Sequence, residues 1–99
     1  MLYNYSIDDE ELQHLTAKQK RCFLKLQKMG VPVKIWYQNN PEYEDYRGLF
    51  WIDTEEEMSE CFLDYYGMPW GSEKLNKVLE SADLYYEWAN AAYAHVYES

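Results

Sequence analysis

Residues 16–38 read TAKQKRCFLKLQKMGVPVKIWYQ, and this stretch decides much of the expected fold. Thr16 can cap a helix with its side chain, and Gln19, three residues further on, completes a capping box. The apolar residues that follow recur at helical spacing, which predicts a helix over 17–29. Gly30 suits the left-handed position that commonly ends a helix. The stretch therefore predicts a helix with a defined start and a defined end.

The segment after this helix has the alternation of a β-strand. Polar and apolar residues alternate over 31–38, so one set of side chains can face a core. A second strand, rich in aromatic and β-branched residues, is predicted over 46–52, with Gly48 as a candidate bulge. Residues 39–45 would connect the two strands as an antiparallel hairpin. Since an isolated hairpin is only marginally stable, helices must cover one of its faces.

The rest of the chain is predicted to be mainly helical. Cap signals at Thr54 and Ser72 predict a helix over 54–66 and a long last helix over 73–97. A further short helix is expected near the N-terminus, and whether 7–29 forms one helix or two stays open. The expected fold is a single α+β domain over 1–99, with a small antiparallel β-hairpin packed against three or four helices in the order α(α)ββαα.

The predicted last helix carries two apolar stripes. One suits the core of the domain, and the second begins only in the latter half of the helix. This second stripe is a possible dimer seam, made of Leu84, Trp88, Ala91 and His95. The alternative is that the hairpin and the first helices cover both stripes.

The charge is strongly negative and unevenly distributed. The formal net charge is −9, from 18 acidic and 9 basic residues. Residues 1–40 hold six bases and four acids, whereas residues 41–99 hold three bases and fourteen acids. A surplus of acids argues against direct binding to nucleic acid, which needs clustered Lys and Arg. It is compatible with a basic protein partner or with a role in solubility alone.

The sequence shows no targeting or cross-linking signals. It has no apolar run of about 20 residues, as a membrane span would need, and no signal peptide pattern at its start, so we expect a cytoplasmic protein. Cys22 and Cys61 are expected to be free thiols on the packing faces of their helices.

No constellation of residues points to catalysis, a metal or a cofactor. Ser6, Thr16, Thr54 and Ser72 are explained as helix caps, and no nucleophile-elbow glycine pattern or phosphate-binding glycine loop is present. Clusters of Cys, His and carboxylates with the spacing of a metal site are also missing from the sequence. We therefore expect a protein that is not an enzyme.

Acidic and aromatic residues interleave in the middle of the sequence, and this pattern is typical of an interaction surface. Tyrosine and tryptophan anchor many protein interfaces, and carboxylates around them steer a basic partner. The predicted partner-binding residues are Glu42, Tyr43, Glu44, Asp45, Tyr46, Glu56, Glu60, Asp64 and Trp70. Acids at the start of a predicted helix are also explained by capping, so a purely structural role stays open.

In size, charge and tyrosine content the chain resembles small acidic proteins that occupy basic grooves. That class includes phage anti-CRISPR proteins, anti-restriction DNA mimics and nuclease inhibitors. The stretch Tyr65-Tyr66-Gly67 resembles a short segment of barstar-type nuclease inhibitors, although the predicted order of elements departs from theirs. The resemblance implies an inhibitor or adaptor that binds a basic, nucleic-acid-handling protein such as a nuclease or CRISPR effector.

Three other interpretations stay open. The chain could be a structural or regulatory homodimer that uses the predicted last helix. The lysine-rich helix over 17–29 could bind DNA directly, against the charge of the rest of the chain. An enzyme of an unrecognised type is the third.

Overall fold

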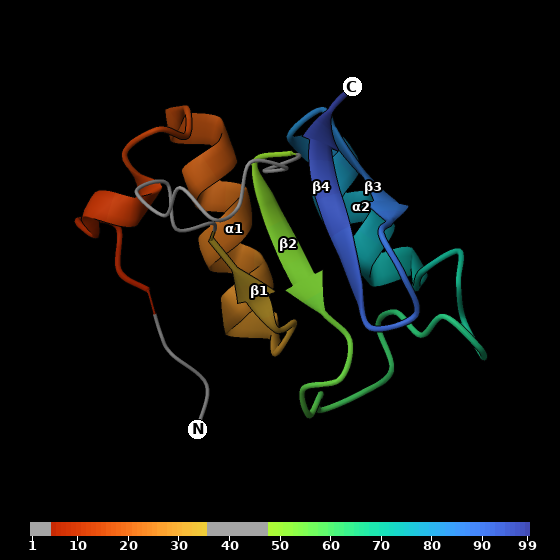
Figure 1. Ribbon diagram of the computed structural model, residues 1–99. Helices are drawn as coiled ribbons and strands as arrows, with labels where there is room; N and C mark the ends of the chain where they lie inside the picture. Colours follow the sequence, from red (N-terminus) through yellow and green to blue (C-terminus); the bar gives the residue numbers. More distant parts are fainter. Residues whose placement is uncertain (1–4, 36–47) are drawn as a thin grey trace.

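A computed structural model of the chain describes residues 5–35 and 48–99. The elements are η1 (Glu10–Leu12), α1 (Ala17–Met29), β1 (Val33–Lys34), β2 (Phe50–Asp53), α2 (Glu73–Ser81), β3 (Leu84–Trp88) and β4 (Tyr93–Glu98). The strands form one antiparallel sheet in the order β1-β2-β4-β3, with α1 behind β1 and α2 behind β3 and β4 (Figure 1). The part of the chain that is described thus has one sheet with a single layer of helices, α1 and α2, on one of its faces.

Helix α1 begins and ends where its sequence predicts. The Thr16 side chain accepts a hydrogen bond from the Gln19 backbone N–H, and the Gln19 side chain accepts one from the Thr16 backbone N–H. Gly30 has a left-handed backbone with φ 98°, and its N–H donates to the carbonyl oxygens of Leu26 and Gln27. The helix over 17–29 is confirmed, and within the described residues 5–16 it is preceded by a short 3₁₀ turn, η1.

The core lies between the sheet and the two helices. On β2, Phe50 and Ile52 point toward the helices, opposite Val96 and Ala94 of the neighbouring strand β4. Phe23 of α1 packs edge-on against Phe50, with ring centroids 5.0 Å apart. The fully buried large side chains are Leu12, Phe23, Leu26, Val31, Pro32, Phe50, Ile52, Phe62, Leu63, Leu75, Leu79 and Val96. Burial of this set is the main source of stability.

The predicted architecture, with three or four helices around a hairpin, is wrong. The chain forms α1, α2 and a four-stranded sheet, and it remains an α+β fold. The predicted antiparallel pairing of the first two strands is present, although β1 and β2 are shorter than expected.

The long last helix fails after Ser81. Asp83 has a left-handed backbone with φ 58°, which interrupts a helix, and the chain then turns into β3. The Asn90 side chain accepts hydrogen bonds from the backbone N–H groups of Ala92 and Tyr93, and this closes the turn into β4. The residues of the second apolar stripe are therefore spread over β3, the β3–β4 turn and β4, and the first stripe is divided between α2 and the two strands.

The predicted helix over 54–66 is also absent from the described structure. Thr54 does not cap it, because its hydroxyl and its backbone N–H both donate to the carbonyl of Ala92 in the β3–β4 turn. Phe62 and Leu63 are both buried, and Cys61 is exposed, whereas it was expected on a packing face. Contacts of this segment with the β3–β4 turn and with the core thus outweigh its local preference for a helix. Among the described helices, none is long and apolar enough to cross a membrane.

Candidate functional site

A tight loop over residues 64–71 presents aromatic side chains beside strand β3. The backbones of Asp64 and Met68 exchange two hydrogen bonds of 2.8 and 3.2 Å. The Asp64 carboxylate accepts further bonds from the backbone N–H groups of Tyr66 and Gly67. Because these bonds close the loop on itself, its backbone is held in one shape.

The same loop is fastened to β3 and to α2. The carbonyl oxygen of Pro69 accepts hydrogen bonds from the Tyr86 hydroxyl at 2.7 Å and from the Trp88 indole N–H at 2.8 Å. The Asn76 side chain donates to the carbonyl of Trp70 at 2.9 Å. Burial raises the pKa of the Tyr86 hydroxyl, so this donor keeps its proton at neutral pH.

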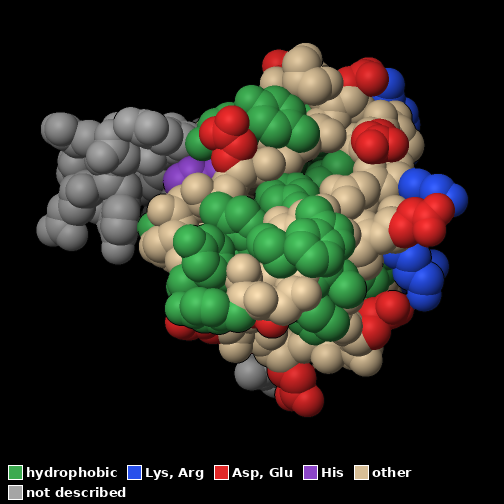
Figure 2. Space-filling model, turned by 90° about the vertical axis from the view of Figure 1, so that its right-hand side faces the viewer, with side chains coloured by type: hydrophobic (Ala, Val, Ile, Leu, Met, Phe, Trp, Pro, Cys, Tyr) green, Lys and Arg blue, Asp and Glu red, His purple; other side chains and the backbone are tan. Residues whose placement is uncertain are grey.

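Large aromatic side chains project from this fixed loop into solvent. Tyr66 is 83% exposed and Trp70 is 71% exposed. Tyr65 lies between the loop and the sheet, with its ring centroid 5.3 Å from those of Tyr66 and Trp88. We call the group Tyr65, Tyr66, Trp70, Tyr86 and Trp88 the aromatic surface. The face of the molecule with β3 and this loop shows hydrophobic side chains gathered over its centre and charged ones toward its margin (Figure 2).

Glu56, Glu60 and Asp64, the predicted acidic residues that the structure describes, have partners within the chain. Lys34 Nζ lies 2.9 Å from both Asp53 Oδ2 and Glu56 Oε1, and 5.4 Å from the centroid of the Trp51 ring. Burial lowers the pKa of Lys34, but its hydrogen bonds to Glu56 and Asp53 outweigh this effect, and the net shift is upward. Lys74 pairs with Glu60 at 3.1 Å. Thus Glu56 and Glu60 are partly neutralised by lysines, and Asp64 holds the loop.

The predicted partner-binding set is therefore only partly brought together. Asp64 and Trp70 share the aromatic loop, and Glu60 pairs with a lysine of α2. Glu56 belongs to the cluster around Lys34 instead. Glu42, Tyr43, Glu44, Asp45 and Tyr46 lie outside the described residues. Tyr66, the most exposed large hydrophobic side chain described, was not singled out as an anchor, although an Asp two residues before it is a turn signal.

The proposed dimer seam does not form one surface. Leu84 is buried toward the helices, and Trp88 is fastened to the aromatic loop. Ala91 lies exposed in the β3–β4 turn. His95 is 8% exposed and lies on the opposite face of β4, near the Tyr93 and Tyr97 rings. These four residues would lie on one face only if the segment 84–95 were helical, and it forms two strands and a turn instead.

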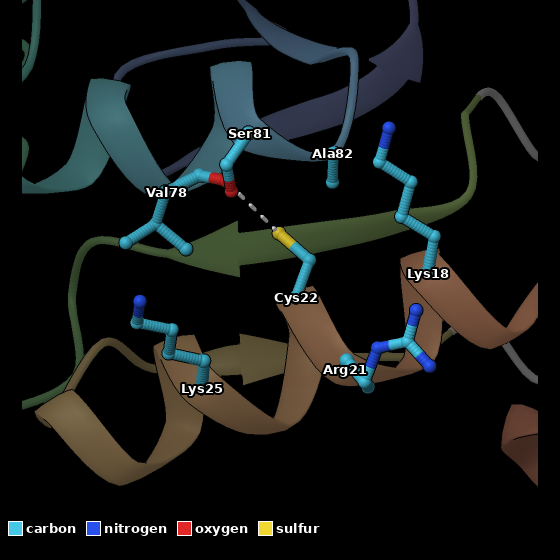
Figure 3. Close-up of a pocket in the computed structure, with 7 residues that line it drawn as sticks. All are labelled: Lys18, Arg21, Cys22, Lys25, Val78, Ser81 and Ala82. Atoms are coloured by element: carbon cyan, nitrogen blue, oxygen red, sulfur yellow. Dashed lines mark hydrogen bonds between the residues drawn. The ribbon is translucent and has the colours of Figure 1, made fainter.

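A second candidate is a basic groove between α1 and α2, with a cavity volume of about 250 Å³. Lys18 and Lys25 extend toward α2 on either side of Cys22, with Arg21 nearby (Figure 3). The remaining lining residues are Val78, Ser81 and Ala82 of the facing segment. Lys18 is paired with Asp83 at 2.9 Å.

The thiol in this groove is poorly suited to nucleophilic chemistry. Burial raises the pKa of Cys22 to about 11, and the nearby Lys25 only partly offsets this effect. The thiol therefore stays protonated at neutral pH, and the thiolate is the reactive form. Its sulfur lies 3.6 Å from the carbonyl of Val78. Within residues 5–35 and 48–99, no group of three or more Cys, His, Asp or Glu is placed to hold a metal ion.

No family model matches the chain, and no curated protein or solved structure shows significant similarity to it. The aromatic surface and the basic groove are thus judged on their own geometry.

Proposed function

We propose that this protein is a small protein-binding inhibitor or adaptor that docks on its partner through the aromatic surface. The observation that carries the proposal is the pair Tyr66 and Trp70, which stay largely exposed on a loop that several backbone hydrogen bonds close on itself and fasten to α2 and β3. Tyr66 and Trp70 leave most of their ring surface in water, which costs solubility, and the edge-on contact of Tyr66 with Tyr65 covers only a small part of that surface. A binding role explains their position better than a structural one.

The fixed loop favours tight binding. An aromatic anchor contributes most when it is held in its bound orientation before the partner arrives, because little conformational entropy is then lost. Tyrosine and tryptophan are the residues most often found at the energetic centre of an interface. The contacts of Pro69 with Tyr86 and Trp88 hold the loop against the sheet, which provides such preorganisation.

The charge of the chain favours a basic partner. A net charge of −9 attracts a positively charged surface over long range and increases the rate of association at low salt. Proteins that handle nucleic acid carry such surfaces, so a nuclease or a CRISPR effector is the class of partner that we propose. The described acids nearest the loop are engaged within the chain, so we assign the local contact to the aromatic rings and the steering to the overall charge.

The proposal predicts that Trp70→Ala weakens partner binding by about 30-fold, equivalent to about 2 kcal/mol for a central aromatic anchor. Partners would be captured from a lysate of the source cells with immobilised protein, identified, and then titrated against each variant at low and high salt. Tyr66→Ala is expected to have a smaller effect in the same direction. Ile7→Ala is the matched control, since Ile7 is also a large exposed hydrophobic residue, at 55%, but lies outside the loop.

Two outcomes would refute this function. One is an unchanged affinity of Trp70→Ala for a partner that binds the wild-type protein. The other is a captured partner without a basic surface, whose binding does not weaken as salt is added.

A further inference from the structure

Strand β3 is an edge of the sheet and has unpaired backbone groups. The sheet order β1-β2-β4-β3 places β4 on one side of it only. Asp83 and Ala89 flank the strand; the Asp83 carbonyl accepts a hydrogen bond from the Ser99 N–H, and the Ala89 N–H donates to the carbonyl of Tyr93. In an antiparallel pair this pattern repeats every second residue, so Leu84, Tyr86 and Trp88 direct their N–H and C=O groups away from β4. In the described parts of the chain, those groups have no backbone partner.

The sequence of this edge lacks most of the features that usually prevent pairing. Natural edge strands are commonly protected by lysine, proline, a bulge, short length or a covering loop. The loop over 64–71 contacts the side chains of Tyr86 and Trp88 through the Pro69 carbonyl, and within the described residues it makes no hydrogen bond to their backbone groups. The sequence of β3 is LYYEW, with five paired residues, no lysine, no proline and a regular register along β4. Its only charge is Glu87, and Tyr85 beside it is 42% exposed. The other edge, β1, has only two residues.

We propose that a second copy of this chain pairs with the edge of β3, antiparallel and around a two-fold axis at Tyr86. The two four-stranded sheets then become one continuous sheet. Hydrogen-bonded pairs must join residues whose backbone groups point outward, which here are Leu84, Tyr86 and Trp88. Centring the pair on Tyr86 places Leu84 opposite Trp88 of the second copy. The outward backbone groups of Leu84, Tyr86 and Trp88 then all form hydrogen bonds across the dimer.

The charges of β3 favour the same register. With the axis at Tyr86, Glu87 lies opposite Tyr85 of the second copy, and the two carboxylates do not face each other. An axis at Glu87 would oppose the two carboxylates, which destabilises a strand pair. The strand is thus self-complementary in one register.

The overall charge sets how this dimer responds to salt. Two copies of net charge −9 repel each other, so added salt strengthens the dimer by screening. The proposed basic partner has the opposite dependence. The dimer shares Tyr86 and Trp88 with the aromatic surface but uses their backbone groups, whereas the proposed function rests on the exposed side chains of Tyr66 and Trp70. The opposite salt dependences, and variants at position 85 outside the aromatic surface, distinguish failure of the dimer from failure of the proposed function.

The test is analytical ultracentrifugation of the full chain with a reciprocal pair of variants at position 85. Tyr85→Lys brings an ammonium group opposite Glu87 of the second copy at two symmetric places, and we expect association about 2- to 30-fold tighter. Tyr85→Glu brings like charges together there, and we expect association weaker by a similar factor. Both variants lose the same stacking of Tyr85 on Tyr97, so this loss cancels in the comparison.

A charge swap tests the register itself. The double variant Tyr85→Glu with Glu87→Lys again pairs opposite charges across the axis, and we expect it to recover the association that Tyr85→Glu loses. Circular dichroism of each variant checks that it is folded. A wild-type protein that stays monomeric at millimolar concentration and high salt would overturn the proposal. So would equal shifts for Tyr85→Lys and Tyr85→Glu, or a swap that recovers nothing.

Discussion

Replacing Phe23 by alanine is expected to lower the free energy of unfolding by about 3–5 kcal/mol. Phe23 is fully buried at the centre of α1, with its ring edge-on to Phe50 of β2 at 5.0 Å and to Tyr5 at 5.2 Å. The substitution removes the contact that joins the helix to the sheet and leaves a cavity, so the transfer and cavity costs add. A domain of this size has a total stability of about 5–15 kcal/mol, so the variant would be close to unfolding.

Chemical denaturation of Phe23→Ala, followed by circular dichroism, measures this loss. Phe23→Leu keeps most of the buried volume and should cost about 1.5 kcal/mol or less. Lys25→Ala, on the exposed side of the same helix, should change stability by less than about 0.5 kcal/mol. A loss below about 1 kcal/mol for Phe23→Ala would mean that α1 does not pack on β2 as described.

The second large effect is expected from Gly48→Ala, with a loss of at least about 2 kcal/mol. Gly48 has a left-handed backbone with φ 85°, and a Cβ atom there would lie 2.4 Å from the carbonyl oxygen of Val96. That oxygen accepts the backbone hydrogen bond of Leu49 at 2.7 Å, so it cannot move away without loosening the start of β2. The backbone strain of alanine at a positive φ and the overlap of its Cβ with the Val96 oxygen therefore both destabilise the variant.

Gly67→Ala is the matched control for this substitution. Gly67 is outside the positive-φ region, and an added Cβ would meet the Asp64 carboxylate at 2.9 Å, a side-chain group that can move only by weakening its hydrogen bonds to the backbone of Tyr66 and Gly67. We expect a loss of about 1 kcal/mol, smaller than that of Gly48→Ala, in the same denaturation assay. Equal losses for the two glycines would contradict the close approach of residue 48 to β4.

Local signals in the sequence predict α1 and the start of α2, which Ser72 caps as expected, and they fail for residues 54–66 and 84–98. The start and end of α1 are decided by Thr16, Gln19 and Gly30, which act within one helical turn. In residues 84–98, by contrast, apolar residues satisfy the helical and the strand period at once. The choice is made by Asp83, with its left-handed backbone, and by the turn at Asn90. As turn signals, Asp83 and Asn90 are too weak in the sequence to outweigh the helical spacing of the apolar residues around them.

The candidate site could be predicted only in part, because charge pairing is decided in three dimensions. Trp70 was expected to be an anchor and is exposed. The carboxylate of Glu56 is bound by Lys34, which is 22 residues away in the chain, and Glu60 is bound by Lys74, 14 residues away. No spacing rule connects residues that far apart. The sequence therefore overstates how many of these acids face a partner.

The most direct test of the aromatic surface as a binding site is site-specific photo-crosslinking in the source cells. A benzophenone amino acid would replace Tyr66 in one variant and Ile7 in another, two exposed positions. The segment before η1 and the loop over 64–71, which carry these positions, lie at opposite sides of the molecule (Figure 1). The proposed function predicts that a basic protein is crosslinked from position 66 and not from position 7. Crosslinking of the same protein from position 7 alone, or equally from both, would contradict the assignment of the binding site to the aromatic surface.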